Sequence, residues 1–193
     1  DVYVISDEIW SDLILKGHKH IPTQSVSEDA KNRTVALYAP SKTFNLAGLI
    51  GSYHIIYNSW LRDRVEKQSS LCHYNNMNMY ALIGAYKPEG EDWVDELCQV
   101  LTENVEMAYD FFQKKDGIRL QKPQGTYMLF LDFEGWCKAH NKTMDELICA
   151  GQEVGVYWQD GRPFHGAYSI RMNLALPKSR VEEALRRLEK YVL

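Results

Sequence analysis

The first third of the chain alternates short apolar runs with helical segments. Continuous apolar runs predict β-strands at residues 2–5, 34–38 and 53–57. Polar residues follow the first run at once, as expected of a strand that is buried on both faces of a sheet. A helix is predicted to begin with Ser59 as its N-cap and to end near residue 69. Strands interleaved with helices are typical of an α/β fold.

Two further helices lead to a change of pattern near residue 88. A short apolar segment at 77–86 predicts one helix, and apolar residues at helical spacing over 91–114 predict a long one. Lys87-Pro88-Glu89-Gly90, between them, is a typical breaker sequence. We therefore predict a domain boundary that separates residues 1–88 from residues 89–193.

The second half of the chain mixes strands and helices in a different order. Strands are predicted at residues 119–121, 127–133 and 168–176, and helices at 144–151 and 179–191. The last helix carries apolar residues on one face and begins after a Pro-Lys-Ser stop-and-cap signal. This order predicts a second, smaller domain of the α+β class.

Composition and charge narrow the class of protein. With 45% hydrophobic and 25% charged residues, the chain has the balance of an ordinary globular protein. A net charge of −4 argues against a nucleic-acid partner. No apolar stretch approaches the roughly 20 residues that a membrane-spanning helix needs, so no membrane association is expected.

The cysteines and histidines do not form a recognisable metal or disulfide pattern. The four cysteines are Cys72, Cys98, Cys137 and Cys149. Their spacing is unpaired, so we expect them to be reduced and mostly buried, as in a cytoplasmic protein. His18 and His20 could form a metal pair on an extended segment, but no third ligand lies near them in the sequence. We therefore expect no metal site.

Polar residues follow the first two predicted strands, where ligands bind in open α/β sheets. Asp7 follows the first strand and Lys42 the second, so both are candidates for one site. A buried lysine amine is a nucleophile for Schiff-base chemistry; the alternative is a solvated lysine in a tight turn. Asp7 either pairs with a buried cation or caps the next turn. Glu8 is the weaker candidate because strand alternation points it to the other side.

Arg171 interrupts the apolar strand predicted at 168–176. A charged residue inside such a strand is seldom buried unless it is paired. Either the strand has one wet face, or the guanidinium receives a carboxylate in bidentate fashion. Gly161 to Gly166, just upstream, are expected to form a mobile loop beside it.

Several linked motifs carry a resemblance to a known family. They are Ser6-Asp7-Glu8-Ile9, Gly17-His18-Lys19-His20-Ile21-Pro22, Ala39-Pro40-Ser41-Lys42-Thr43-Phe44-Asn45-Leu46-Ala47-Gly48-Leu49, Pro123-x-Gly125-Thr126-Tyr127 and Ile170-Arg171-Met172-Asn173. Together, and in this order, they resemble the class I/II aminotransferase superfamily of pyridoxal-phosphate (PLP) enzymes of fold type I. Within it they look most like the cystathionine β-lyase, or C–S lyase, branch. The resemblance covers essentially the whole chain.

The resemblance implies a role for each candidate residue. Lys42 falls on the lysine that binds PLP covalently and removes the substrate's Cα proton. Asp7 falls on the aspartate that pairs with the pyridine nitrogen, and Ser41 beside Lys42 is a contact to the phosphate. Arg171 falls on the arginine that receives the substrate α-carboxylate.

Two positions depart from the family pattern. Many aminotransferases carry a phosphate-binding arginine eight residues after the lysine, where this chain has Ile50. The C–S lyase branch commonly lacks that arginine, so Ile50 favours the lyase branch. Trp10 stands where relatives often have a tyrosine or histidine near the cofactor's phenolic oxygen. Because an indole donates one hydrogen bond and accepts none, this contact is expected to be altered.

The resemblance also implies an architecture. Residues 1–88 would be the C-terminal part of the PLP-binding large domain, which has a mostly parallel sheet, and residues 89–193 the small C-terminal domain. The chain begins at Asp1, directly before a strand, so we expect an N-terminal half to precede it. Residues 1–193 alone are then expected to be inactive.

The function implied is β-elimination on a sulfur amino acid, such as cystathionine or cysteine, to pyruvate, ammonia and a thiol. The enzyme would be a cytoplasmic homodimer. PLP-dependent transamination is the alternative reaction, and a regulatory binding protein on the same fold is the non-enzymatic alternative.

Overall fold

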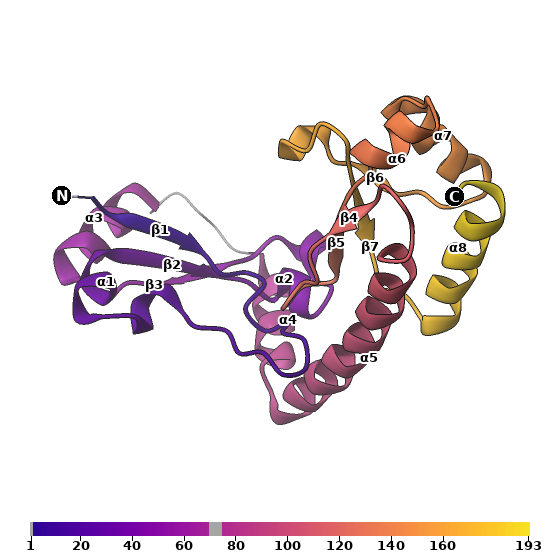
Figure 1. The fold of residues 1–193 in the computed structure, drawn as a ribbon. Coiled ribbons are helices and arrows are strands. Elements are labelled where there is room, and N and C mark those ends of the chain that lie inside the picture. The colour runs from indigo at the N-terminus through magenta and orange to yellow at the C-terminus, as the bar shows by residue number, and fades with distance from the viewer. Residues whose placement is uncertain (1, 70–74) are drawn as a thin grey trace. The chain divides into compact units, whose positions relative to one another are not determined.

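The computed structural model describes residues 2–69 and 75–193, and the chain divides into two compact units. The first unit is Asp1–Leu97 and the second is Cys98–Leu193 (Figure 1). The division falls within helix α5 (Pro88–Phe112), which begins at the breaker sequence. The boundary after residue 88, and the domain identities attached to it, stay predictions.

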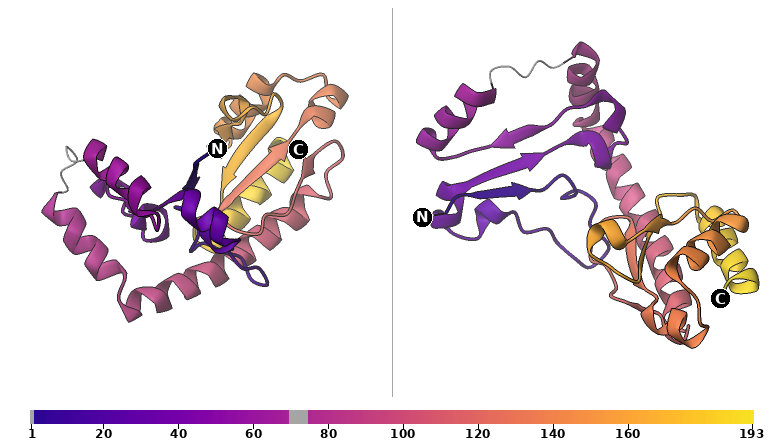
Figure 2. Two further views of the ribbon diagram at one scale, coloured as in Figure 1. Left: turned by 90° about the vertical axis from the view of Figure 1, so that its left-hand side faces the viewer. Right: turned by 90° about the horizontal axis from the view of Figure 1, so that it is seen from above.

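The first unit is built on a mixed three-stranded sheet. Its strands are β1 (Val4–Asp7), β2 (Thr34–Tyr38) and β3 (Tyr53–Ile55), side by side in the order β1-β2-β3 (Figure 2). β1 and β2 are parallel, with Asp7 opposite Leu37, whereas β2 and β3 are antiparallel. All three strands predicted from the apolar runs are present, and β3 ends two residues earlier than predicted.

Four α-helices accompany this sheet among the described residues. They are α1 (Glu28–Arg33), α2 (Pro40–Thr43), α3 (Ser59–Ser69) and α4 (Asn76–Ala85), with 3-10 turns η1 (Thr23–Ser25) and η2 (Ala47–Leu49). The helices predicted at 59–69 and 77–86 are confirmed. Helix α1 was not predicted; its sequence signal is the N-cap Ser27, whose side chain accepts a hydrogen bond from the Ala30 amide.

The prediction that the first strand is buried on both faces is wrong. Tyr3 and Ile5 are 52% and 75% exposed, whereas Val35 and Ala36 of β2 are buried. β1 has one neighbouring strand in the described sheet, and its side chains alternate between half-buried and exposed. A continuous apolar run shows that a strand has two apolar faces, but not whether something covers both.

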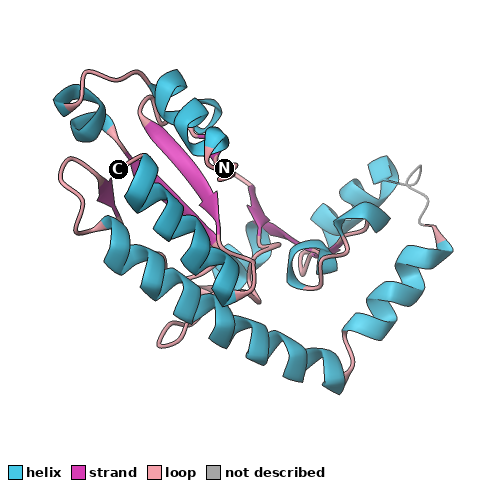
Figure 3. Ribbon diagram, turned by 90° about the vertical axis from the view of Figure 1, so that its right-hand side faces the viewer, coloured by secondary structure: helices cyan, strands magenta, loops and turns pink. Residues whose placement is uncertain are grey.

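The second unit carries a four-stranded antiparallel sheet. Its strands are β4 (Arg119–Leu120), β5 (Met128–Asp132), β6 (Gln159–Asp160) and β7 (Ser169–Asn173), in the order β4-β5-β7-β6. Its helices are the part of α5 from Cys98 onward, α6 (Glu134–Ala139), α7 (Met144–Glu153) and α8 (Lys178–Tyr191), with the turn η3 (Arg162–Phe164). Figure 3 shows α5 and α8 along one face of this sheet. The predicted α+β class is confirmed.

The core of the second unit follows the strand and helix periodicities. Alternate residues of β5 and β7 are buried, and they share the interior with one stripe each of α5 and α8. These residues are Leu129, Leu131, Ile170 and Met172 from the strands, Leu101, Val105, Ala108 and Phe112 from α5, and Val181, Leu185 and Leu188 from α8. The other face of the sheet, which carries Phe130 and Arg171, stays accessible.

A buried asparagine ties α5 to the end of β7. Asn104 is fully buried, and its Nδ2 donates to the carbonyl oxygens of Leu174 at 3.0 Å and Leu176 at 2.9 Å. These two carbonyls lie just past β7, where the sheet no longer supplies donors. The side chain therefore supplies a donor to the Leu176 carbonyl and a second donor to the Leu174 carbonyl, which also accepts from the Leu176 amide at 2.8 Å.

Replacing Asn104 with leucine is expected to lower the free energy of unfolding by about 2 kcal/mol, because the Leu176 carbonyl loses the Asn104 donor and the Leu174 carbonyl loses one of its two donors. Urea denaturation measures this. Asn32→Leu is the matched control: Asn32 also donates to a backbone carbonyl, that of Glu28 at 2.9 Å, but on the exposed surface of α1. Equal losses in the two variants would contradict the role given to Asn104.

The structure tests the expectations about membrane-spanning helices and about the burial of the cysteines. No helix among the described residues is long and apolar enough to cross a membrane. Of the described cysteines, only Cys137 is buried, whereas Cys98 is half-buried and Cys149 exposed. Only one of these three cysteines is buried, so the expectation that most would be buried is wrong for them. A cysteine on a helix, such as Cys149, can face solvent without disturbing the core. Cys72 lies outside the described residues.

Candidate functional site

The first unit brings Asp7 and Lys42 to one edge of the sheet. Asp7 is the last residue of β1, and Lys42 follows the end of the parallel strand β2 by four residues. The carboxyl ends of parallel neighbours share an edge, so the two predicted residues meet the geometry expected of a ligand site. Asp7 is exposed, and its Oδ1 accepts a long hydrogen bond of 3.3 Å from the Ile9 amide.

Lys42 lies in a one-turn helix rather than in the predicted tight turn. Pro40 is the first residue of α2, where its fixed φ angle suits a helix. Its missing N–H costs nothing there, because the first amide of a helix has no acceptor within the helix. Lys42 is half-buried, and its Nζ lies 5.6 Å from the centroid of the Trp10 ring. Ser41 is the preceding residue of α2 and is also half-buried. The structure thus brings Trp10, Ser41 and Lys42 together.

The residues after Lys42 anchor α2 to the rest of the unit. Thr43 is 1% exposed and its Oγ1 donates to Oδ2 of Asp12 at 2.8 Å. The Phe44 ring packs edge-on against Tyr86, with centroids 5.5 Å apart, and stacks on Trp93 at 5.9 Å. Because both neighbours on the C-terminal side are fixed, the backbone that carries Lys42 is fixed as well.

A cavity of about 460 Å³ lies beside the end of α2. Asp12, Thr43 and Phe44 line one part of it, and Tyr86 lines another. Lys42 and Asp7 are not among its lining residues. The cavity therefore does not define the place where the two predicted residues would act.

Glu8, a weaker candidate than Asp7 from the sequence, is a buried carboxylate with four hydrogen-bond partners. It is 5% exposed, and its Oε1 accepts from the Thr23 amide and the Ser6 hydroxyl, each at 3.0 Å. Its Oε2 lies 2.7 Å from Nε2 of His20 and accepts from the Tyr38 hydroxyl at 3.0 Å. We call these five residues the Glu8 cluster. The alternation that pointed Glu8 away from Asp7 is confirmed.

The Glu8 cluster fixes the charge states of Glu8 and Tyr38. Burial raises the pKa of Glu8, but hydrogen bonds from His20, Thr23, Ser6 and Tyr38 outweigh it, so the pKa lies below its ordinary value. Burial and the bond to Glu8 raise the pKa of Tyr38 to about 12. At neutral pH an ionised Glu8 therefore joins the ends of β1 and β2, which carry Asp7 and Lys42.

His20 belongs to this cluster and not to a metal pair with His18, which is exposed. Among residues 2–69 and 75–193, no three His, Cys, Asp or Glu side chains are placed to hold a metal ion. The sequence signal for the contact between His20 and Glu8 is the motif Gly17-His18-Lys19-His20-Ile21-Pro22. The motif contains the histidine, but its spacing does not indicate that Glu8 is the partner.

Arg171 belongs to the second unit and lies in the middle of β7 on its accessible face. Its Cζ is 3.9 Å from the centroid of the Phe164 ring, and its Nη1 donates to Oε1 of Gln159 at 3.1 Å. The strand therefore has a wet face, which confirms one interpretation of the sequence, whereas the carboxylate-binding role of Arg171 stays a prediction. The predicted loop 161–166 contains η3, a hydrogen-bonded turn.

The sequence profile of the family described as "Aminotransferase class I and II" matches residues 1–188. The chain belongs to this family. The match spans both units and all the candidate residues. It confirms the family that the motifs indicated.

Individual relatives extend the comparison. Cystathionine beta-lyase PatB of Bacillus subtilis (strain 168) is 31% identical over 194 residues, or 97% of this chain and 49% of that protein. An aspartate aminotransferase of Bacillus sp. (strain YM-2) is 27% identical over 199 residues, or 100% of this chain and 50% of that protein. The chain spans about half the length of the curated relatives it matches.

A solved structure supports the same fold. Cystalysin from Treponema denticola, which contains a pyridoxal 5'-phosphate cofactor, superposes with a TM-score of 0.85 at 33% identity. The superposition covers 98% of this chain and 49% of cystalysin. The fold class implied by the motifs is therefore confirmed: the chain has the mixed α/β fold of fold type I PLP enzymes.

Proposed function

We propose that the whole protein is a PLP-dependent C–S lyase that performs β-elimination on a sulfur amino acid such as cystathionine or cysteine. The products would be pyruvate, ammonia and a thiol. The observation that carries the proposal is the placement of Asp7 and Lys42 at the carboxyl ends of neighbouring parallel strands. The 31% identity to a cystathionine beta-lyase supports the reaction class.

The side chains of the first unit fit PLP. When bound, the cofactor supplies a ring that withdraws the electrons left at the substrate Cα. The exposed Asp7 carboxylate keeps acceptor positions for a pyridinium N–H, since its local hydrogen bond is long. The Lys42 amine would bind the cofactor and take the Cα proton. Ser41, next along α2, offers a hydroxyl to the phosphate, and Trp10 covers one side of the Lys42 amine.

The second unit would supply the substrate contact. Arg171 presents a planar fork of N–H donors on an accessible sheet face, which is the shape that pairs with a carboxylate. We assign it the α-carboxylate of the amino-acid substrate. The whole protein is proposed to act as a homodimer in the cytoplasm.

Transamination is the second candidate, because an aspartate aminotransferase matches the chain at 27% identity. Both reactions begin with removal of the Cα proton and diverge afterwards. Ile50 favours the lyase: it is 81% exposed at the position where many aminotransferases have a phosphate-binding arginine. An aliphatic side chain there offers a phosphate neither a charge nor a hydrogen bond.

The complete protein, assayed with PLP and cystathionine, is expected to release pyruvate without any added keto acid. Lactate dehydrogenase coupled to NADH oxidation measures the pyruvate. In a parallel reaction with aspartate and 2-oxoglutarate, we expect exchange to be slower by at least about tenfold in kcat/KM. Faster exchange with the keto acid, and no pyruvate from cystathionine, would replace the lyase with a transaminase.

A further inference from the structure

We propose that Phe164 and Gln159 are positioning residues that hold the Arg171 guanidinium in the orientation needed to receive a carboxylate. We call these two side chains the Arg171 cradle. The inference rests on the proposed function, in which Arg171 binds the substrate α-carboxylate. It explains how the guanidinium of Arg171, on a solvent-accessible face, is held in one orientation before a carboxylate binds.

The cradle contacts two different parts of the guanidinium. The guanidinium carbon Cζ lies over the Phe164 ring, 3.9 Å from the ring centroid. Gln159 binds one edge by accepting from Nη1 at 3.1 Å. A guanidinium has five N–H donors, so donors remain for a bidentate carboxylate. Gln159 is its one hydrogen-bond partner among the residues that the structure describes.

The sheet register sets the position of Gln159. In the antiparallel pair of β6 and β7, Gln159 stands directly opposite Arg171, and in the pair of β5 and β7, Phe130 stands opposite it. Residues directly opposite one another point to the same face of a sheet. Arg171 therefore lies between Phe130 on one neighbouring strand and Gln159 on the other. Of these two side chains, Gln159 is the one that can accept a hydrogen bond.

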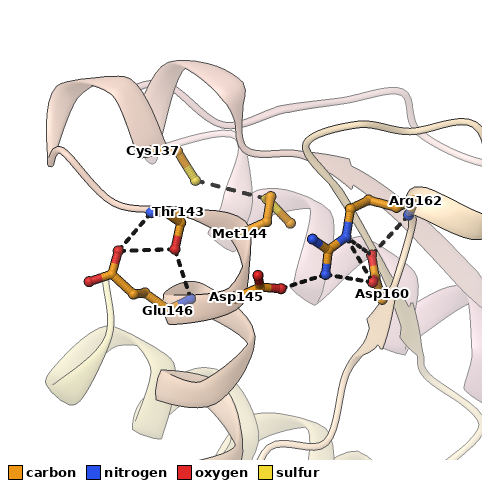
Figure 4. Close-up of polar contacts among 7 residues, drawn as sticks. All are labelled: Cys137, Thr143, Met144, Asp145, Glu146, Asp160 and Arg162. Atoms are coloured by element: carbon orange, nitrogen blue, oxygen red, sulfur yellow. Dashed lines mark hydrogen bonds and ion pairs between the residues drawn. The ribbon is translucent and has the colours of Figure 1, made fainter.

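The turn that carries Phe164 is fixed by an ion-pair network. Nε of Arg162 donates to both carboxylate oxygens of Asp160, at 3.0 and 2.9 Å, and its Nη2 donates to Asp145 of α7 at 2.6 Å (Figure 4). The Arg162 amide also donates to Asp160, at 2.9 Å. Figure 4 shows the guanidinium of Arg162 between the two carboxylates. The network links the turn to β6 and to the first turn of α7.

Backbone contacts complete the turn. The Gly161 amide donates to the Ser169 carbonyl at 2.8 Å, and the Phe164 amide donates to the Gly161 carbonyl at 2.9 Å. A Cβ at Gly161 would lie 2.4 Å from the Ser169 oxygen, so this close approach requires glycine. Phe164 is thus anchored to β7 through the same turn that brings it over Arg171.

An aromatic ring this close to the guanidinium has two effects. It attracts the cation through the ring quadrupole, and it keeps water from one side of the guanidinium. A fork that is already oriented loses less conformational entropy when a carboxylate binds. The expected consequence is tighter binding of substrates that carry the carboxylate, with little effect on the bond-breaking steps at Cα.

The test uses the complete protein, with cysteine and cysteinamide as a pair that differs only at the carboxyl group. Phe164→Leu and Gln159→Leu are each expected to raise KM for cysteine roughly fivefold while kcat changes less than twofold. The preference for cysteine over cysteinamide in kcat/KM should fall by a similar factor. Phe164→Tyr keeps the ring and should restore the preference, and Arg162→Gln should lower it less than Phe164→Leu does.

A matched control removes a similar contact elsewhere. Lys190 Nζ lies 4.8 Å from the centroid of the Tyr191 ring on α8, so Tyr191→Leu breaks a cation–aromatic pair that is not near Arg171 in the sheet. It should leave the acid-to-amide preference unchanged. NMR of the guanidinium nitrogens gives a second readout: rotation about the Arg171 Nε–Cζ bond should be slower in the wild type than in Phe164→Leu.

The outcomes separate the cradle from the proposed function. If Arg171→Lys lowers the acid-to-amide preference and Phe164→Leu and Gln159→Leu do not, the cradle is overturned and the function stands. If Arg171→Lys leaves the preference unchanged, the assigned role of Arg171 in the proposed function fails, and the cradle fails with it. A loss in Tyr191→Leu equal to that in Phe164→Leu would also overturn the cradle.

Discussion

Replacing Lys42 with alanine in the complete protein is expected to reduce pyruvate release from cystathionine by at least about 100-fold. The amine at the end of α2 is the group proposed both to bind the cofactor and to take the Cα proton. Two measurements follow the loss: the coupled pyruvate assay, and the visible absorption of covalently held PLP, which should disappear. Lys42→Arg is expected to behave like Lys42→Ala, because it keeps the charge beside Trp10 but not the nucleophilic amine.

Lys31→Ala is the matched control for Lys42. Lys31 also lies over an aromatic ring, with Nζ 5.0 Å from the centroid of Tyr57, but on helix α1, away from the carboxyl ends of β1 and β2. It should keep pyruvate release within about twofold of the wild type. Retention of more than a tenth of the activity in both Lys42 variants would remove the basis for assigning catalysis to this residue.

Long periodic segments were predictable from the sequence because their patterns are unambiguous. The stripe of α8 and the long stripe of α5 were recognised from helical spacing, and all three strands of the first unit from apolar runs. Short elements were missed: α6 and β6 have six and two residues, too few for a period to repeat. Their formation depends on tertiary contacts, such as the pairing of β6 with β7.

The candidate site was predictable in part. Asp7 and Lys42 were placed at strand ends by local pattern, and the parallel pairing of β1 and β2 confirms that they share an edge. Partners far apart in the sequence were not predictable. Phe164 covers Arg171, and His20 reaches Glu8, through contacts that depend on how a turn and a loop fold back.

Glu8 shows most clearly what a local pattern omits. Alternation correctly directs it away from Asp7, and the absence of an obvious partner in the sequence made it look unimportant. Its four hydrogen-bond partners lie 2 to 30 positions away in the sequence. They come from β1, β2 and the segment at residues 20–23. A buried carboxylate with four donors is therefore the junction of the elements that position the site.

Replacing Glu8 with glutamine is expected to lower the free energy of unfolding at pH 7 by about 2–3 kcal/mol. The amide nitrogen of glutamine would face donors where the carboxylate oxygen accepts, and the buried charge-assisted bonds would be lost. Urea denaturation of the protein and its variant measures the difference. Asp7→Asn is the matched control, since the neighbouring carboxylate is exposed; its stability should change by less than about 0.5 kcal/mol.

The pH dependence of this difference gives an independent check. Because the pKa of Glu8 in the folded protein lies below its ordinary value of 4.5, the folded state holds fewer protons there than the unfolded state. The stabilisation is therefore fully present above about pH 4.5 and is lost as the pH falls through the lower, folded-state pKa. The gap between wild type and Glu8→Gln should shrink in that acidic window. A gap that stayed constant down to pH 3 would show that the ionised carboxylate is not its cause. Asp7→Asn should lose PLP absorption while keeping its stability, whereas Glu8→Gln should lose stability first, because we propose that Asp7 binds the cofactor and that Glu8 stabilises the fold.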